Sequence, residues 1–318
     1  MILTDYFRSE PDVTWSGALC AGVTHGTIRL PDDTSFDPTS KEQVGYVCDR
    51  FRAYGIKPLV LEPLPDLLHS HIKLGDEKRD ESIEKVIKLL ANLKENGITT
   101  VCFNFMAHYG WTRTAHTRIE RGGAHVTGFR LADFEADGFS IDADTLWKNY
   151  RYFINAILPH AKANGIRLAL HPDDPPLESL GKAARIFTSL DNIKRAVEAD
   201  SDHLGVTFCQ ACYYLMGENL EEAVKTLADK IFFIHFRNVR GVRSDFYETF
   251  HDNGAINMKN MLELYTKNCM YNARNIPIRV DHVPTLPFEN GAEDGYDAIG
   301  RQFALGYLKG LLEGINEN

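Results

Sequence analysis

Short apolar segments alternate along the chain with longer amphipathic ones. The apolar segments are rich in β-branched and aromatic residues and have few polar interruptions, as expected of strands that are covered on both faces. Seven strands are predicted in this way, at Ala18–His25, Pro58–Glu62, Thr99–Phe105, Arg167–His171, Leu204–Cys209, Ile231–Val239 and Ile276–His282. An eighth strand is expected near the N-terminus, at Ile2–Phe7 or Val13–Gly17.

The segments between the strands have apolar residues at helical spacing. In Asp80–Glu95, five aliphatic side chains share one face of a helix. Similar patterns predict helices at Leu146–Ala163, Asp191–Ala199, Leu220–Asp229, Met258–Tyr265 and Ile299–Leu312. Alternating strands and helices are typical of an α/β fold with a parallel sheet. With 318 residues, the chain fits a single-domain (β/α)8 TIM barrel. An open doubly wound sheet is the alternative, but no glycine-rich phosphate fingerprint follows the first strand.

One stretch, residues 106–138, interrupts the alternation. It follows a predicted strand and contains Trp111, four arginines and three histidines. In a barrel, the segments that follow strands surround the C-terminal mouth, where substrates bind. We therefore expect this insertion to form a lid over the mouth.

Composition and charge exclude some classes of partner. The net charge of −9 argues against a nucleic-acid or membrane surface, because both need clustered lysine and arginine. A small anionic substrate needs only one or two local cations. No signal peptide or membrane-spanning segment is visible, so we expect a cytoplasmic protein. Six cysteines in such a chain favour free thiols or metal ligands over a disulfide framework.

Residues of the types that bind metals lie at the C-terminal ends of four successive predicted strands: His171, Cys209, His235 and Asp281. Each has a structural explanation when taken alone, such as a loop residue, a buried thiol, a core histidine or a helix cap. Because parallel barrel strands end at one mouth, the four side chains are expected to converge. Two imidazoles, a thiolate and a carboxylate suit a divalent transition metal.

Three further residues are candidates for chemistry near this site. Arg237 lies two positions after His235 and so faces the same way, where it would bind a substrate carboxylate or pair with a structural acid. His282 follows Asp281 directly, so both reach the site only if the chain turns there. The phenol of Tyr296 could exchange a proton or simply pack in the interior.

A C-x-x-C pair occurs at Cys209 and Cys212. A redox pair would place the first cysteine at a helix N-terminus, and a structural zinc site would need a second pair, which the sequence lacks. We interpret Cys212 as a structural residue.

The sequence resembles the mannonate dehydratase family over nearly its whole length. The resemblance is carried by segments in a fixed order, at His71–Thr114, Gly165–Pro176, Gly205–Cys209, Ile234–Arg237, Thr249–Gly254 and Ile278–Arg301. The most specific are the His-Pro-Asp-Asp-Pro-Pro run that starts at His171 and the Trp-Thr-Arg run that starts at Trp111.

The resemblance implies a xylose-isomerase-like TIM barrel and a hydro-lyase of hexuronate catabolism that contains Mn²⁺ or another divalent ion, such as Fe²⁺, Co²⁺ or Mg²⁺. It implies that the metal ligands are the four residues named above and that His282 and Tyr296 are the catalytic pair. It also implies substrate-binding roles for Asn104, Trp111 and His251, besides Arg237. The expected reaction converts D-mannonate, or a related aldonate, to 2-keto-3-deoxy-D-gluconate and water.

Three departures from the family pattern border the pocket. Val283-Pro284-Thr285 replaces the glycine that usually follows the Asp-His pair, and Gln210-Ala211-Cys212 replaces a Gly-Ser after the metal-binding cysteine. The N-terminal Arg-Trp-Tyr-Gly element is reduced to Trp15-Ser16-Gly17. Two other functions therefore stay open: a metal-dependent sugar isomerase or epimerase, and a barrel that binds a sugar acid without turnover. The sequence is also compatible with a homo-oligomer.

Overall fold

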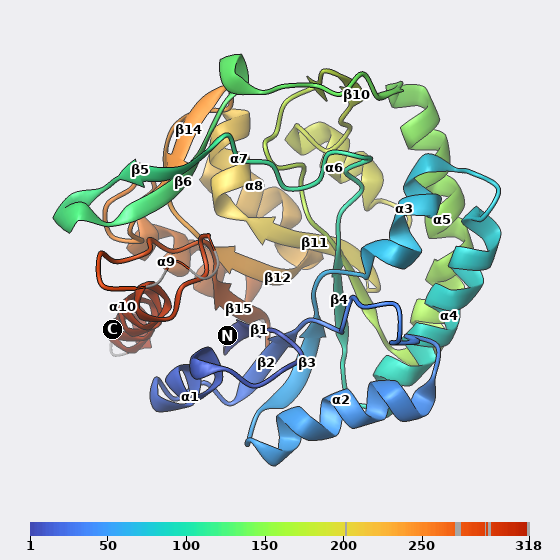
Figure 1. The fold of residues 1–318 in the computed structure, drawn as a ribbon, viewed down its shortest axis with the longest axis horizontal. Helices are drawn as coiled ribbons and strands as arrows, with labels where there is room; N and C mark the ends of the chain where they lie inside the picture. Colours follow the sequence, from blue (N-terminus) through green and yellow to red (C-terminus); the bar gives the residue numbers. More distant parts are fainter. Residues whose placement is uncertain (201, 271–274, 290, 292–293, 317–318) are drawn as a thin grey trace.

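The apolar segments pair as parallel strands and close an eight-stranded barrel (Figure 1). The computed structural model describes residues 1–200, 202–270, 275–289, 291 and 294–316. In order around the barrel, the strands are β1 (Ile2–Phe7), β15 (Pro277–Val280), β12 (Ile231–Phe236), β11 (Leu204–Cys209), β8 (Arg167–Leu170), β4 (Thr100–Phe103), β3 (Lys57–Leu61) and β2 (His25–Ile28). This confirms the predicted single-domain (β/α)8 architecture.

Helices surround the barrel, with their apolar faces against the outer side of the strands (Figure 1). They are α1 (Val13–Cys20), α2 (Lys41–Ala53), α3 (Asp66–Leu74), α4 (Arg79–Glu95), α5 (Ala143–Asn164), α6 (Leu190–Ala196), α7 (Gln210–Met216), α8 (Leu220–Leu227), α9 (Met258–Cys269) and α10 (Ala298–Asn316). Short 3₁₀ turns lie at Arg121–Gly123, Leu131–Asp133 and Ala228–Lys230. The six predicted helices are confirmed, whereas α1, α2, α3 and α7 were not predicted.

The N-terminal region differs from two of the sequence-based expectations. Ile2–Phe7 is the barrel strand, so the alternative strand at Val13–Gly17 is wrong. The predicted strand Ala18–His25 is also wrong, because its first residues end helix α1 and β2 begins only at His25. The Asp12 carboxylate caps this helix by accepting a hydrogen bond from the Thr14 amide, which favours a helix over a strand.

The insertion at residues 106–138 contains regular structure of its own. Strands β5 (Ala115–Ile119) and β6 (His125–Arg130) form an antiparallel hairpin. Its turn contains Gly122 and Gly123, both at positive φ, a conformation that glycine adopts without steric cost. The hairpin joins β14 (Asp245–Glu248) and β13 (Val239–Val242) in a four-stranded sheet outside the barrel. A smaller sheet combines β7 (Ser140–Ile141), β10 (Lys182–Ala184) and β9 (Ser179–Leu180).

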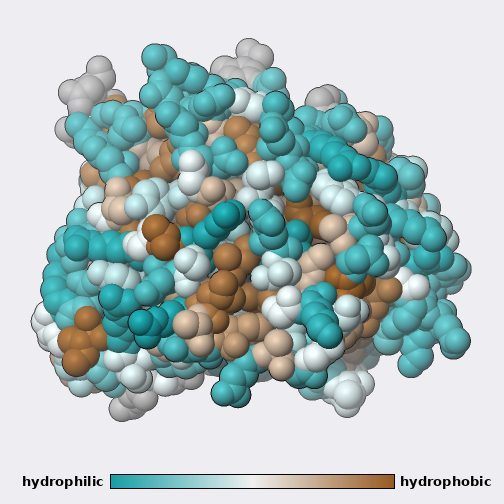
Figure 2. All heavy atoms as spheres, turned by 90° about the horizontal axis from the view of Figure 1, so that it is seen from above, coloured by the Kyte–Doolittle hydropathy of each residue, from teal (hydrophilic) through white to brown (hydrophobic). Residues whose placement is uncertain are grey.

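The surface is mixed in character. Seen from above, hydrophilic side chains predominate and apolar ones form a band across the middle of the face (Figure 2). Among the described residues, no helix combines the length and the apolar character needed to cross a bilayer.

Candidate active site

A cavity of about 680 Å³ opens at the C-terminal ends of the barrel strands. One half of its wall carries the predicted ligand types, with His171 after β8, His235 in β12 and Asp281 after β15. The other half is formed by β1 to β4, which contribute Tyr6, Arg29, Glu62 and Asn104. The four predicted ligands thus come from one half of the barrel, and Glu62 reaches His235 from the other half, where with Cys102 it completes a further group that could hold a metal ion.

The four residues predicted as metal ligands lie together. Donor atoms of Cys209, His235 and Asp281 all lie within 4.8 Å of one another. The imidazole of His171 packs beside that of His235, with ring centroids 4.9 Å apart, and its donor nitrogen lies within 4.8 Å of the Cys209 sulfur. Residues up to 110 positions apart in the sequence thus form two overlapping groups of donor atoms that share the Cys209 sulfur.

The environment of His235 fits a bound cation. Its ring is fully buried, and neither nitrogen makes a hydrogen bond of good geometry, although Nε2 lies 2.9 Å from Glu62 Oε1 and Nδ1 lies 3.3 Å from Asp281 Oδ2. Burial and the nearby Arg279 disfavour protonation, but the two carboxylates outweigh them and raise the pKa of His235 well above its usual value. The site therefore favours a positive charge between these carboxylates, which a divalent ion would supply in place of the proton.

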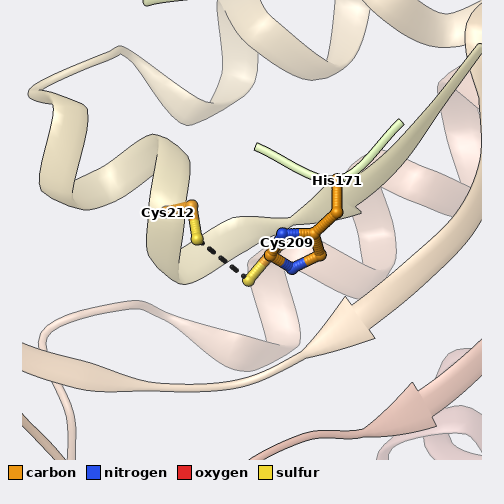
Figure 3. Close-up of side chains that lie close together, drawn as sticks. All are labelled: His171, Cys209 and Cys212. Atoms are coloured by element: carbon orange, nitrogen blue, oxygen red, sulfur yellow. Dashed lines mark hydrogen bonds between the residues drawn. The ribbon is translucent and has the colours of Figure 1, made fainter. Parts of the chain in front are cut away.

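Cys209 is held in a form suited to metal binding. Burial alone would raise the pKa of its thiol, but the Cys212 thiol, the Arg237 guanidinium and the imidazoles of His171 and His235 together hold that pKa well below its usual range. Figure 3 shows the sulfurs of Cys209 and Cys212 pointing toward one another beside the His171 ring. A thiolate is the form in which cysteine binds metals.

Hydrogen bonds that could not be predicted from the sequence hold the Asp281 carboxylate in place. The guanidinium of Arg279 donates to Asp281 Oδ1 over 2.9 Å, and its Nε and Nη2 donate to the carboxylate of Glu62. The phenol of Tyr296 donates to the same Asp281 oxygen over 2.9 Å. These contacts leave Asp281 Oδ2 directed at His235 and set the orientation of the carboxylate.

His282 and Tyr296 lie side by side on the cavity wall. Their rings meet edge to face with centroids 5.3 Å apart. His282 has a positive φ of 36°, and this turn brings its side chain into the cavity that also contains the preceding Asp281. The chain therefore turns at this position, as both residues require if they are to reach the site.

Arg237 lines the cavity but is also paired with structural acids. Its guanidinium donates to Asp174 over 2.6 Å and to both oxygens of Glu248 over 2.6 and 2.8 Å. Arg113 donates to the same two carboxylates, so two arginines and two acids form a buried network. Most donors of Arg237 are thus committed within the protein, and its role toward a substrate remains a prediction.

Of the other three residues predicted to bind substrate, two line the cavity and one lies behind it. Asn104 and Trp111 line the cavity, and the Trp111 ring packs 4.9 Å from the ring of His282. His251 is fully buried behind β12, outside the described lining of the cavity, and its Nε2 donates to the Phe236 carbonyl. Burial lowers the pKa of His251 to about 4, which keeps this ring neutral and able to support the strand.

Several polar residues of the cavity were not identified from the sequence. Glu62 directly follows β3, a strand that was predicted from the sequence, so its position alone could have indicated it. Arg29 follows β2, which was placed wrongly. Lys73 reaches the cavity from helix α3, which was not predicted, and its ammonium donates to Asn104 over 3.0 Å. Arg279 faces the interior two positions before Asp281, as strand alternation requires.

Comparison with known proteins decides which family the fold and site represent. The profile of D-mannonate dehydratase (UxuA) matches residues 28–138 and 130–318. A mannonate dehydratase of Oceanobacillus iheyensis is 31% identical, over 93% of this chain and 92% of that protein. The chain belongs to the D-mannonate dehydratase family. As a member of this family, it is a hydro-lyase.

Other mannonate dehydratases agree with this assignment. The enzyme of Streptococcus agalactiae serotype III is 32% identical over 87% of each chain. The crystal structure of mannonate dehydratase from Streptococcus suis serotype 2 superposes with a TM-score of 0.90 at 26% identity, and covers 99% of this chain and 93% of that one. A xylose isomerase domain protein from Planctomyces limnophilus has a TM-score of 0.62 at 14% identity, with 99% of this chain and 97% of that one covered, which confirms the xylose-isomerase-like fold.

Proposed function

We propose that this member of the mannonate dehydratase family converts D-mannonate, or a related aldonate, to 2-keto-3-deoxy-D-gluconate and water with the help of a divalent metal ion. The observation that carries the proposal is that His171, Cys209, His235 and Asp281 form two overlapping groups of donor atoms, and that His171, His235 and Asp281 line the same cavity as His282 and Tyr296. The family name supports a sugar acid as the substrate.

The four converging side chains would hold the ion, which we propose to be Mn²⁺, with Fe²⁺, Co²⁺ and Mg²⁺ as alternatives. Imidazole, thiolate and carboxylate donors suit a borderline divalent ion. When bound, such an ion polarises the carboxylate and the 2-hydroxyl of a sugar acid and makes the C2 proton more acidic.

The protein's own residues would move the protons. One of His282 and Tyr296 removes the proton from C2, and the other gives a proton to the 3-hydroxyl as it leaves. Arg237 lies at the cavity wall, where its positive charge would stabilise the enediolate. We propose that residues 106–138 cover the mouth as a lid, from which Trp111 packs on His282 and excludes water from that side of the ring.

The direct test is an assay of a panel of aldonic acids with manganese and with a chelator, in which products are identified by NMR. We expect a 2-keto-3-deoxy acid from a six-carbon aldonate with metal and none after chelation. An epimer formed without loss of water would favour a sugar isomerase or epimerase. Binding without turnover would favour a sugar-acid-binding barrel.

A second experiment separates the roles of the catalytic pair. In D₂O, a variant that lacks the proton donor to the 3-hydroxyl still exchanges the C2 hydrogen of the substrate, whereas a variant that lacks the base does not. His282→Asn and Tyr296→Phe are the matched pair, and both should retain metal. Normal turnover in both variants would refute the assignment.

A further inference from the structure

The second cysteine of the C-x-x-C pair lies beside the candidate metal centre. We propose that Cys212 is an additional sulfur donor to the ion, so that the centre favours thiophilic ions such as Zn²⁺ and Co²⁺ more strongly than the four other donors alone would. The inference rests on the proposed function, because it concerns the ion that this site holds.

The positions of the donor atoms support this assignment. A nitrogen of His171 and the sulfurs of Cys209 and Cys212 all lie within 4.8 Å of one another. The two sulfurs are 3.4 Å apart. Since a zinc–sulfur bond is about 2.3 Å long, this separation would allow both sulfurs to bind one ion.

The local fold produces this spacing. Cys209 is the last residue of β11 and the residue that precedes helix α7. Cys212 lies three residues later in the first turn of that helix, so its side chain returns toward Cys209 (Figure 3). The C-x₂-C spacing is the one with which cysteine pairs chelate zinc.

Cys212 is buried in the core beside a positive charge. The guanidinium of Arg237 has its Nη1 atom 3.5 Å from the Cys209 sulfur and 3.9 Å from the Cys212 sulfur. Both sulfurs are fully buried, so two thiolates there need nearby positive charge. Arg237 and a divalent ion would supply it together.

Binding of the ion by Cys212 requires the loss of the thiol proton. Without an ion, the Cys212 thiol donates a hydrogen bond to the Cys209 sulfur. On binding, the S–H bond of Cys212 would break, its electron pair would form the bond to the ion, and one proton would be released to solvent. No oxidant or reductant takes part.

Cobalt is the probe, and Cys212→Ser is the main variant. Cysteine thiolates bound to Co²⁺ give a sulfur-to-metal charge-transfer band in the near ultraviolet. We expect this band to fall to roughly half of its wild-type intensity in Cys212→Ser, as one of two sulfur ligands is lost. Zn²⁺ affinity should fall about tenfold or more, whereas Mn²⁺ affinity changes by less than about threefold. Calorimetry in two buffers should show that about one proton fewer is released with Zn²⁺.

Two further variants keep the test decisive. Cys212→Ala replaces the serine variant if that protein does not fold. Cys48→Ser changes a buried cysteine of helix α2 and should leave the cobalt band and the zinc affinity unchanged.

The outcomes separate this inference from the proposed function. If Cys212→Ser and Cys212→Ala match the wild type in cobalt band and zinc affinity, Cys212 is only a hydrogen-bond donor and the inference is wrong, while the proposed function stands. If the reduced wild-type protein binds none of Zn²⁺, Co²⁺ and Mn²⁺, both fail.

Discussion

Asp281 and His282 are consecutive residues at the end of a strand, yet both side chains line the same cavity. Neighbours in a strand normally face opposite sides. The positive φ of His282 turns its side chain back, so that Nδ1 lies 3.1 Å from Glu248 Oε1 and Nε2 lies 3.6 Å from Asp281 Oδ1. One candidate metal ligand and one candidate catalytic group are thereby placed side by side.

This backbone conformation predicts a difference between two substitutions of His282. Asparagine adopts positive φ readily, whereas a β-branched residue is strained there. We expect His282→Val to be less stable than His282→Asn by about 1–2 kcal/mol in urea unfolding, although both lose the contact with Glu248. Equal unfolding free energies would show that the turn is not strained.

The buried network around Arg237 predicts a large loss of stability when one partner is removed. Arg237→Met leaves Asp174 and Glu248 with only Arg113 as a direct arginine partner, which should reduce the free energy of unfolding by about 3–5 kcal/mol. The control is Lys225→Met, which breaks an exposed pair with Glu221 and should cost less than about 0.5 kcal/mol. Denaturant unfolding measures both, and similar losses in the two variants would contradict this account.

The same network predicts instability in acid. Burial alone would raise the pKa of the Glu248 carboxyl, but Arg237, His282 and Arg113 outweigh it and lower that pKa from its usual 4.5 to about 2. Because the folded pKa is the lower one, the pairing stabilises the fold fully above the usual value, and this stabilisation is lost as pH falls toward 2.

The lost free energy of unfolding is on the order of 3 kcal/mol for this group. Urea titrations at a series of pH values measure it. In Glu248→Gln, which is less stable at neutral pH, the further drop in acid should be smaller by a similar amount. A wild-type unfolding free energy that stays constant from about pH 6 to pH 2 would rule out this pairing.

The position of Lys73 at the cavity wall predicts a role in substrate binding. The residue is 4% exposed, and its ammonium lies 3.0 Å from Asn104 Oδ1 and 3.4 Å from Asp66 Oδ1. Asn104 follows β4, which lies opposite β15 in the order of the barrel, so Lys73 faces the metal half of the cavity. We expect it to bind hydroxyl groups at the end of the substrate remote from the carboxylate.

Lys73→Met should raise KM for a six-carbon aldonate about tenfold or more, the value of a charge-assisted hydrogen bond, with a much smaller change in kcat. Lys88→Met, on the exposed face of helix α4, should change neither constant. Steady-state kinetics and metal content together check this prediction. An unchanged KM, or a loss of metal in Lys73→Met, would contradict it.

The sequence by itself determined the barrel and the half of the cavity with candidate metal ligands. Continuous apolar segments and helical periodicity identified six of the eight barrel strands together with their order, and the N-terminal strand as one of two alternatives. Because parallel strands all end at one mouth, His171, Cys209, His235 and Asp281 could be expected to meet before any distance was known. Local patterns sufficed because strand alternation is a property of each segment alone.

Tertiary structure decided what depends on contacts between distant segments. Trp15 of α1 stacks on Phe51 of α2 with ring centroids 4.2 Å apart, and this packing favours a helix in the apolar N-terminal stretch. The pairing of Arg237 with two acids and the approach of Lys73 to Asn104 join residues that share no sequence pattern. Packing of the whole chain determines such contacts. A buried charge needs a partner of opposite charge, and only the tertiary fold decides which residue lies beside it.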